Sequence, residues 1–193
     1  MPPGVKAAEK RREVVAQAAE LFDRTGYHTT SVAELARAAG LSKPTLYHYF
    51  SSKGEILFWI HEEFIDLLIE KERARPPDLE AGEALREVMR DVLGLMDTHR
   101  GHVRVFFEHY RELSAGDQAT IAQKRDAYEA TVERLIARGI ESGELRPVDP
   151  RLTALAVFGM CNWAYQWYRN DGALASREIA DVFFDLLFSG LRR

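Results

Sequence analysis

The stretch from Thr30 to Lys53 constrains the fold of this chain more than any other part of it. Ser31 is followed three residues later by Glu34, which is the capping-box pattern that starts a helix. Gly40 can adopt the left-handed backbone conformation in which many helices end. The sequence therefore predicts a short helix at about 31–39 that stops at a glycine.

A second short helix is predicted immediately after that turn, at about 43–50. Ser42 can cap its start, and Pro44 is tolerated in the first turn of a helix. Leu46 and Phe50 would be buried, and the helix would present Lys43, Thr45, Tyr47, His48 and Tyr49. Two short helices joined by a tight turn form a helix-turn-helix, whose second helix can enter the major groove of DNA.

This stretch resembles the DNA-binding domain of the TetR family of bacterial transcriptional regulators. The residues that match, all at the spacing of the family, are Gly26, Thr30, Leu35, Ala36, Ala39, Gly40, Leu46, Tyr47, Phe50 and Lys53. The resemblance implies an all-helical, homodimeric repressor that binds a palindromic operator in double-stranded DNA and responds to a small-molecule effector.

Eight side chains of the stretch are candidates for DNA contact. Those placed to reach base edges are Lys43, Thr45 and His48, with Pro44 offering apolar contact to a thymine methyl. Those better placed for phosphates are Ser31, Tyr47, Tyr49 and Lys53.

Positive charge gathers on the N-terminal quarter of the chain. Residues 1–53 hold eight Lys or Arg against five Asp or Glu, which gives +3, whereas residues 54–193 hold eighteen against twenty-five, which gives −7. The two values sum to the −4 of the whole chain. A basic segment is the expected electrostatic footprint of a DNA-binding domain, and the acidic remainder should disfavour DNA contact elsewhere.

The rest of the chain shows helical periodicity and no strand-like alternation. Beyond the helix pair, apolar spacing and caps predict helices at about 6–25, 53–75, 85–96, 103–113, 117–142, 150–169 and 176–191, with a bend at 99–102. The expected fold is all-α with nine helices in two domains. These are a DNA-binding domain over 1–53 and an effector-binding and dimerisation domain over 54–193.

The C-terminal half also resembles one subgroup of the family, the regulators of fatty-acid or steroid catabolism that respond to acyl-coenzyme A thioesters. The residues behind this resemblance are Trp163 to Tyr168, Gly172, Leu174 and Glu178-Ile179-Ala180. It implies a hydrophobic effector, an acyl-coenzyme A thioester. The alternative effector is an aromatic or cationic drug sensed by a repressor of an efflux gene.

Large aromatic side chains are dense in this half, and an apolar cavity with a few polar groups is what a small-molecule site requires. The candidates for effector contact are Phe106, Tyr110, Trp163, Gln166 and Trp167. Arg104, in a basic cluster with Arg100 and His102, is a candidate for a coenzyme A phosphate. Core and dimer-interface roles are the competing interpretation for the aromatic residues, and a solvated helix corner is the competing interpretation for the basic cluster.

The last two predicted helices, 150–169 and 176–191, are apolar over too much of their circumference for burial on one side. The residues expected in a four-helix interface across a two-fold axis are Leu152, Leu155, Ala156, Phe183, Leu187 and Leu191. A homodimer would let two recognition helices read a palindrome about one DNA turn apart. A helical protein–protein interaction module that has lost DNA binding is the alternative from another class.

Other functions find little support in the sequence. No nucleophile elbow, glycine-rich phosphate loop or zinc-hydrolase signature is present, so we expect no enzyme and no cofactor, although an acyl-coenzyme A binding enzyme is a third hypothesis. His99, His102 and His109 do not converge, so no metal is expected. The apolar runs are far shorter than the ~20 residues that a bilayer requires, and no signal peptide is evident. With the single cysteine, Cys161, in an apolar run, these features are typical of a cytoplasmic protein without a membrane partner.

Overall fold

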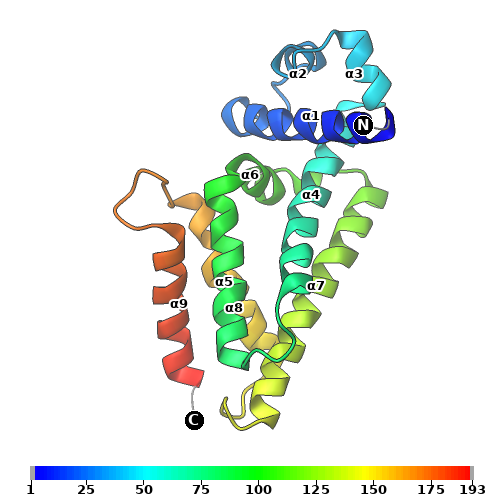
Figure 1. Ribbon diagram of the computed structural model, residues 1–193. Helices are drawn as coiled ribbons and strands as arrows, with labels where there is room; N and C mark the ends of the chain where they lie inside the picture. Colours follow the sequence, from blue (N-terminus) through cyan, green and yellow to red (C-terminus); the bar gives the residue numbers. More distant parts are fainter. Residues whose placement is uncertain (1–2, 192–193) are drawn as a thin grey trace. The chain divides into compact units, whose positions relative to one another are not determined.

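The computed structural model describes residues 3–191 of the chain. Within this range the backbone forms nine α-helices and two short 3₁₀ turns, and no β-strand (Figure 1). The elements are α1 (Pro3–Thr25), α2 (Val32–Ala38), α3 (Lys43–Tyr49), α4 (Lys53–Ala74), α5 (Ala81–Thr98), α6 (Arg100–Glu108), η1 (Tyr110–Glu112), α7 (Ala115–Glu141), α8 (Pro150–Trp163), η2 (Ala164–Gln166) and α9 (Ser176–Leu191). The prediction of an all-helical protein with nine helices is confirmed.

The chain divides into two compact units. Unit 1 comprises Met1–Ile65 and His99–Ile121, and unit 2 comprises Asp66–Thr98 and Ala122–Arg193. Both α4 and α7 contribute residues to each unit. The predicted boundary between residues 53 and 54 falls inside unit 1, and the functional division that it describes remains a prediction.

Local capping explains why α2 and α3 form where they do. The Ser31 hydroxyl accepts a hydrogen bond from the Glu34 backbone N–H, and the Glu34 carboxylate accepts one from the Ser31 backbone N–H at 2.7 Å. Gly40 has φ +65°, the left-handed conformation expected where the first helix stops. The Ser42 hydroxyl then accepts from the Thr45 N–H and starts α3. The predicted pair of capped helices is present.

A shared apolar core holds α1, α2 and α3 together. Its buried side chains are Val14, Val15, Ala18, Phe22, Leu35, Ala36, Leu46 and Phe50. Two helices of seven residues each are too short to be stable alone in water. Full burial of a Leu or Phe side chain contributes about 1.5–3 kcal/mol. Packing, more than helix propensity, therefore fixes the helix-turn-helix.

The helix α6 packs against α1 at a distance that only glycine allows. A Cβ atom at Gly101 would lie 2.8 Å from the backbone carbonyl carbon of Ala19. Beside this contact, Arg104 Nε lies 3.0 Å from the Asp23 carboxylate of α1. The bend predicted at 99–102 is limited to His99, where α5 ends and α6 begins, and Gly101 lies inside α6, where it serves close packing instead of a turn.

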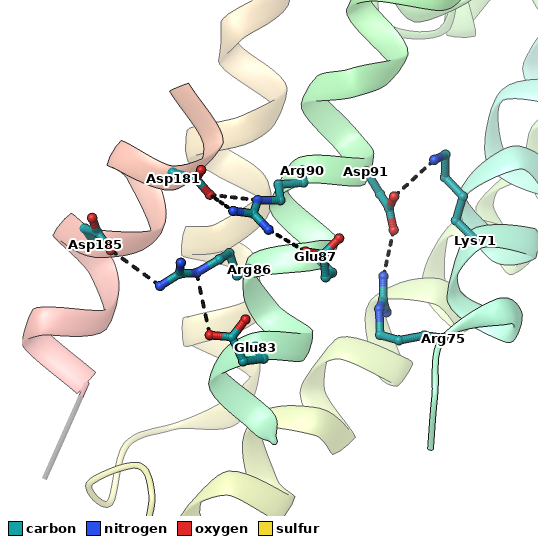
Figure 2. A network of polar contacts seen from close by, with 9 residues as sticks. All are labelled: Lys71, Arg75, Glu83, Arg86, Glu87, Arg90, Asp91, Asp181 and Asp185. Carbon is teal, nitrogen blue, oxygen red and sulfur yellow. Dashed lines mark hydrogen bonds and ion pairs between the residues drawn. The ribbon is translucent and has the colours of Figure 1, made fainter. Parts of the chain in front are cut away.

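Unit 2 is organised around α5, which packs against α9 (Figure 1). The buried side chains of α5 include Leu85, Val88, Met89, Val92, Leu93 and Met96. Polar contacts border this apolar face, as Figure 2 shows. Arg90 reaches the Asp181 carboxylate of α9 at 2.6 Å, and Arg86 lies 3.8 Å from Asp185.

The predicted helix at 150–169 is shorter than expected. The helix α8 ends at Trp163, and a 3₁₀ turn and a loop precede α9. Tyr168 of this loop and Ser176, the first residue of α9, converge on the Asp97 carboxylate at the end of α5, where their hydroxyls each donate at 2.5 Å. These two bonds hold the loop in place, so the chain leaves the helical path after α8.

The predicted helix at 103–113 is also interrupted. The helix α6 ends at Glu108, and the separate turn η1 follows. Here the Tyr110 hydroxyl donates to the Gln118 carbonyl at 2.8 Å, and the Gln118 side-chain amide donates to the Leu113 carbonyl at 2.9 Å. These two bonds tie η1 and the residue after it to the first turn of α7, a contact that apolar spacing does not reveal.

The contact at Gly101 can be tested with a matched pair of glycines. Gly101→Ala should lower the free energy of unfolding by about 1–3 kcal/mol, because the added methyl meets backbone that cannot swing aside. Gly94→Ala, in α5, adds a methyl with no atom within 4 Å, so it should be neutral or stabilise by up to about 1 kcal/mol. Urea unfolding of both variants measures this; equal effects would contradict the close packing.

Candidate functional site

The exposed face of α3 carries the side chains predicted to read bases. Lys43, Pro44, Thr45 and His48 are exposed, while Leu46 between them is buried in the core. Within the described part of the chain, the polar groups of Lys43 and His48 have no hydrogen-bond partner to displace. Thr45 differs, because its hydroxyl lies 2.7 Å from the Ser42 hydroxyl and belongs to the helix cap.

Side chains predicted to contact phosphates have diverse surroundings. Tyr47 is 46% exposed, whereas Tyr49 is half-buried with its ring edge-to-face against His48. The Ser31 hydroxyl donates to the Glu34 carboxylate at 2.7 Å, and the hydrogen bonds from Ser31 lower the pKa of Glu34. A phosphate contact from Ser31 would therefore share the atoms that cap α2.

Lys53 has a structural role that the sequence did not reveal. Its ammonium group donates to the Tyr27 carbonyl at 2.9 Å and the Thr30 carbonyl at 3.0 Å, and it lies 4.3 Å from the centre of the Tyr27 ring. Burial lowers its pKa. Lys53 thus ties the first turn of α4 to the turn before α2, and its proposed phosphate contact would use the remaining N–H.

Basic residues of α1 to α3 divide into those with structural partners and those exposed to solvent. Arg11 pairs with Glu55 at 3.0 Å and lies over the rings of Phe50 and Trp59 at 4.7 and 4.8 Å. Lys10 donates to the Ala39 carbonyl at 3.1 Å. A phosphate contact from Arg11 or Lys10 would therefore compete with these contacts inside the protein. The exposed cations of these three helices are Lys6, Arg12, Arg24, Arg37 and Lys43.

Arg37 is an exposed cation of the helix-turn-helix that was missing from the DNA-contact candidates predicted from the sequence. It lies on α2, is exposed, and forms no ion pair with the described residues. Its position, opposite the buried Leu35 and Ala36 on a short amphipathic helix, is the signal that could have identified it.

Unit 1 also holds three of the six residues proposed for effector contact. Phe106 is buried, with its ring centre 4.4 Å from that of Phe64 on α4. Tyr110 is half-buried and uses its hydroxyl on Gln118. Arg104 pairs with Asp23 and also with Glu108 at 3.1 Å. A role for Arg104 in phosphate binding would require it to leave these carboxylates.

The basic cluster proposed around Arg104 is not a shared exposed surface. His102 is buried at 3% exposure and faces Glu63 at 3.5 Å, whereas Arg100 is exposed. His102 therefore lies on a different face of α6 from Arg100 and Arg104, which are four residues apart and both act on the Asp23 carboxylate.

A buried histidine on α4 stands beside Phe106. His61 is fully buried, and its Nδ1 lies 2.9 Å from the Leu57 carbonyl. This contact requires the proton on Nδ1, so Nε2 carries a lone pair for which the described residues offer no donor within hydrogen-bond geometry. Burial lowers the pKa of His61 from 6.5 to about 4, so the imidazole is neutral at pH 7.

The remaining three effector candidates lie in unit 2 and are exposed. These are Trp163 at the end of α8, Gln166 in η2, and Trp167, whose ring lies 6.3 Å from that of Phe183. Inside this unit, Tyr128 on α7 is buried against Phe158. Its hydroxyl has no hydrogen-bond partner among the described residues, and burial raises its pKa. Such a hydroxyl is a candidate polar contact for a buried ligand.

The outward faces of α8 and α9 carry large apolar side chains. They are Leu152 (65% exposed), Leu155 (44%), Trp163 (65%), Val182 (50%) and Leu186 (67%), here called the apolar stripe. Ala156 is exposed as expected, while Phe183 and Leu187 are half-buried. The expectation for Leu191 is wrong, since it is buried within the chain. The exposed face of α9 is displaced by one residue from the predicted one.

Two further features of the described residues bear on function. No group of three or more His, Cys, Asp or Glu side chains in residues 3–191 is arranged to hold a metal ion. None of the helices described is both long enough and apolar enough to cross a membrane.

The geometry of unit 1 defines a class of protein. A capped helix pair on an apolar core, with an exposed polar face on its second helix and cations around it, is a helix-turn-helix DNA-binding domain. Residues 14–59 match the family model of bacterial regulatory proteins of the tetR family, and residues 78–191 match the tetracyclin repressor-like C-terminal domain. The chain belongs to the TetR family of DNA-binding transcriptional regulators. Its relatives are regulators and not enzymes, as the sequence predicted.

Three relatives illustrate the match. The TetR family regulator PfmR from Thermus thermophilus is 34% identical, with a TM-score of 0.87 over 93% of this chain and 99% of that one. AibR, solved in complex with isovaleryl coenzyme A and operator DNA, is 31% identical, with a TM-score of 0.83 over 93% and 98%. The transcriptional activator FasR from Mycolicibacterium smegmatis is 30% identical, over 95% of this chain and 83% of FasR.

The neutral state of His61 predicts a pH dependence of stability. The unfolded chain binds a proton at this residue below about pH 6.5, whereas the folded chain binds it only near pH 4. The contribution is therefore fully present above pH 6.5 and is lost as the pH falls towards 4, by up to about 3 kcal/mol. Urea unfolding of wild type and His61→Leu at several pH values measures this. Parallel curves would show that His61 is not held neutral by burial.

Proposed function

We propose that this protein is a homodimeric repressor that binds a palindromic operator and is released from it by a small hydrophobic effector. The observation that carries the proposal is the exposed polar face of α3, held between the Ser42 cap and the buried Leu46. Membership of the TetR family supports it. Because its target is chromosomal DNA, the protein would act in the bacterial cytoplasm.

Base recognition is assigned to the exposed start and middle of α3. Lys43 and His48 are free to reach base edges, Thr45 can do so while it shares its hydroxyl with Ser42, and Pro44 offers an apolar surface. Phosphate contacts are assigned to Ser31, Tyr47, Tyr49 and Lys53, to which we add Arg37.

Dimerisation is assigned to the apolar stripe of α8 and α9. Five large apolar side chains on two helices are unusual on a monomer surface. A two-fold axis beside these helices would bury the same stripe of both copies in a four-helix interface. One recognition helix reads only a few base pairs, so a dimer also supplies the specificity that a monomer lacks.

The effector is proposed to be an acyl-coenzyme A thioester. The similarity to AibR, which was solved with isovaleryl coenzyme A, supports this class. The aromatic side chains Phe106 and Tyr110, and in unit 2 Trp163, Gln166 and Trp167, remain its proposed contacts, with Arg104 for a phosphate. To these the structure adds two buried polar atoms that have free hydrogen-bonding capacity, His61 Nε2 and the Tyr128 hydroxyl.

Two alternatives are retained from the sequence. A repressor of an efflux gene would use the same aromatic side chains to bind aromatic or cationic drugs. A helical interaction module without DNA binding would keep the fold but fail to bind operator DNA. The similarity to the activator FasR leaves the direction of regulation to experiment.

The proposed mechanism is a shift between two populated states. The helix α4 connects the DNA-binding helices, to which Lys53 ties it, with His61 and Phe64, which contact Phe106 of α6. An effector that changes the position of α6 or α4 would move α3 and alter the spacing of two recognition helices in a dimer. The effector must bind the two states with different affinity, or the equilibrium does not move.

DNA binding can be tested with the duplex upstream of the protein's own gene and a scrambled duplex. Lys43→Ala should weaken specific binding about 5- to 100-fold and leave binding to the scrambled duplex nearly unchanged. Fluorescence anisotropy at several salt concentrations measures both. Lys71→Ala, a change in unit 2, should bind as wild type does. Equal affinity of the wild type for both duplexes would favour the interaction module.

Lys53→Ala provides a second test on the same duplexes. It should weaken binding to every sequence and lower the salt slope by about one unit. Because it also removes two hydrogen bonds to carbonyls, it should lower the melting temperature. Unchanged binding at every salt concentration, with a lower melting temperature, would restrict Lys53 to its structural role.

The effector class can be tested by thermal denaturation with short-chain, long-chain and aromatic acyl-coenzyme A thioesters, the matching free acids, and coenzyme A alone. A ligand at one hundred times its dissociation constant stabilises by about 2.7 kcal/mol. For a chain of this length that is a rise of several degrees in melting temperature. We expect a larger rise with thioesters than with coenzyme A alone, and none with the free acids. No rise with any thioester would remove this class and favour the efflux alternative.

A further inference from the structure

A groove in unit 2 lies where the end of α4 meets α7. It encloses about 360 Å³ and is lined on one side by Glu72, Arg75 and the Pro76-Pro77 turn, and on the other by residues of α7. The α7 side presents Thr131, Arg134, Leu135 and Arg138. A volume of this size suits a small ligand or one end of a larger ligand. None of these residues belongs to the DNA-binding or effector contacts assigned above.

The charges of this groove do not balance. Arg75 pairs with Glu72 and with Asp91, and Asp91 also pairs with Lys71, as Figure 2 shows in part. These four side chains carry two positive and two negative charges and neutralise one another. Glu72 is the one carboxylate among the residues lining the groove. The guanidinium groups of Arg134 and Arg138 therefore leave it with a net charge of about +2.

Arg134 and Arg138 are unusual neighbours within a chain that holds more acids than bases. They are four residues apart on α7, so they share one face of the helix, and like charges at this spacing repel each other. Neither forms an ion pair with a carboxylate among the described residues. Their hydrogen bonds go to uncharged groups: Arg134 donates to the Thr131 hydroxyl at 2.8 Å, and Arg138 to the Pro77 and Leu79 carbonyls at 3.3 and 3.0 Å.

Those hydrogen bonds hold both guanidinium groups in place before any ligand arrives. Arg138 is held at two nitrogens and Arg134 at one, and each guanidinium has five N–H donors in all. Fixed side chains lose less conformational entropy on binding than mobile ones. Two guanidinium groups with free donors on one face match the oxygens of a phosphate, which they can contact in pairs.

We propose that this groove binds a small ligand through a phosphate or diphosphate group, held by Arg134 and Arg138. The anion would relieve the repulsion between the two arginines, and the Pro76-Pro77 turn and Leu135 would contact the adjoining part of the ligand. The site requires no thioester and uses none of the aromatic side chains assigned to the effector. Coenzyme A, which carries a diphosphate, belongs to the class of ligands that it would bind.

The proposal can be tested by titrating the full-length protein with inorganic pyrophosphate in an isothermal calorimeter at constant ionic strength. Arg134→Gln should weaken binding roughly tenfold or more, because it removes charge-assisted hydrogen bonds. Arg134 is exposed and contacts one hydroxyl, so this variant should fold as the wild type does. Arg151→Gln, which removes an exposed arginine of α8 outside the groove, should leave the affinity within about twofold.

Pyrophosphate could also bind the cations around α3, so Lys43→Gln is included. Retention of affinity in Lys43→Gln together with its loss in Arg134→Gln supports the groove. Equal affinity of Arg134→Gln and wild type overturns the proposal, as does the absence of measurable heat from wild type at about 1 mM pyrophosphate. Neither result bears on operator binding. Repeating the thioester series with Arg134→Gln separates the response to the acyl group from binding of the coenzyme A diphosphate in the groove.

Discussion

The close packing of α6 on α1 is the contact on which the organisation of unit 1 depends. Without a side chain at Gly101, the two backbones approach until a Cβ would lie 2.8 Å from Ala19. That approach brings Arg104 to Asp23, and farther along the chain Glu112 to the imidazole of His28 at 3.2 Å. The three DNA-binding helices are therefore held by a segment that follows them by some fifty residues in the sequence.

This arrangement has a consequence for control of DNA binding. The helix α6 contacts α1 through Gly101 and Arg104, while Phe106 of the same helix packs on Phe64 of α4. One short helix thus carries residues that hold α1 and residues proposed to contact the effector, and Arg104 belongs to both sets. Helices move largely as rigid bodies, so a displacement caused at Phe106 would be felt at α1 without any intermediate loop.

The cations of unit 1 fall into two groups with different physical roles. Lys53, Lys10 and Arg11 use their donors on carbonyls and on Glu55, where they hold helices together. The exposed cations Lys6, Arg12, Arg24, Arg37 and Lys43 have no such partner among the described residues. Only the second group can neutralise DNA phosphates at no structural cost. The eight Lys and Arg residues of 1–53 therefore overstate the number of side chains that can contact phosphates without loss of a structural contact.

Local features of the sequence predicted local structure well, whereas contacts between distant segments escaped it. Ser31, Gly40 and Ser42 act on their own helix ends, so their roles follow from residue type and spacing. Gly101 was predicted to lie in a turn, because only its partner, Ala19, shows that the missing side chain serves packing. In the same way, the carbonyl contacts of Lys53 and Arg138 depend on residues far along the chain.

Trp163 belongs to two of the proposals for unit 2, the effector site and the dimer interface. It is a candidate for effector contact, yet it is 65% exposed and lies eleven residues after Leu152, three helical turns along the same stripe of α8. A ligand on one side of this ring would remove little of its apolar surface from water. A second subunit would cover more of that surface and so contribute more to stability. In a dimer, Trp163 would be covered by the partner, and any effector that contacts it would then contact both subunits. Effector binding and dimer geometry would be coupled directly, which is what a change in the spacing of two recognition helices requires.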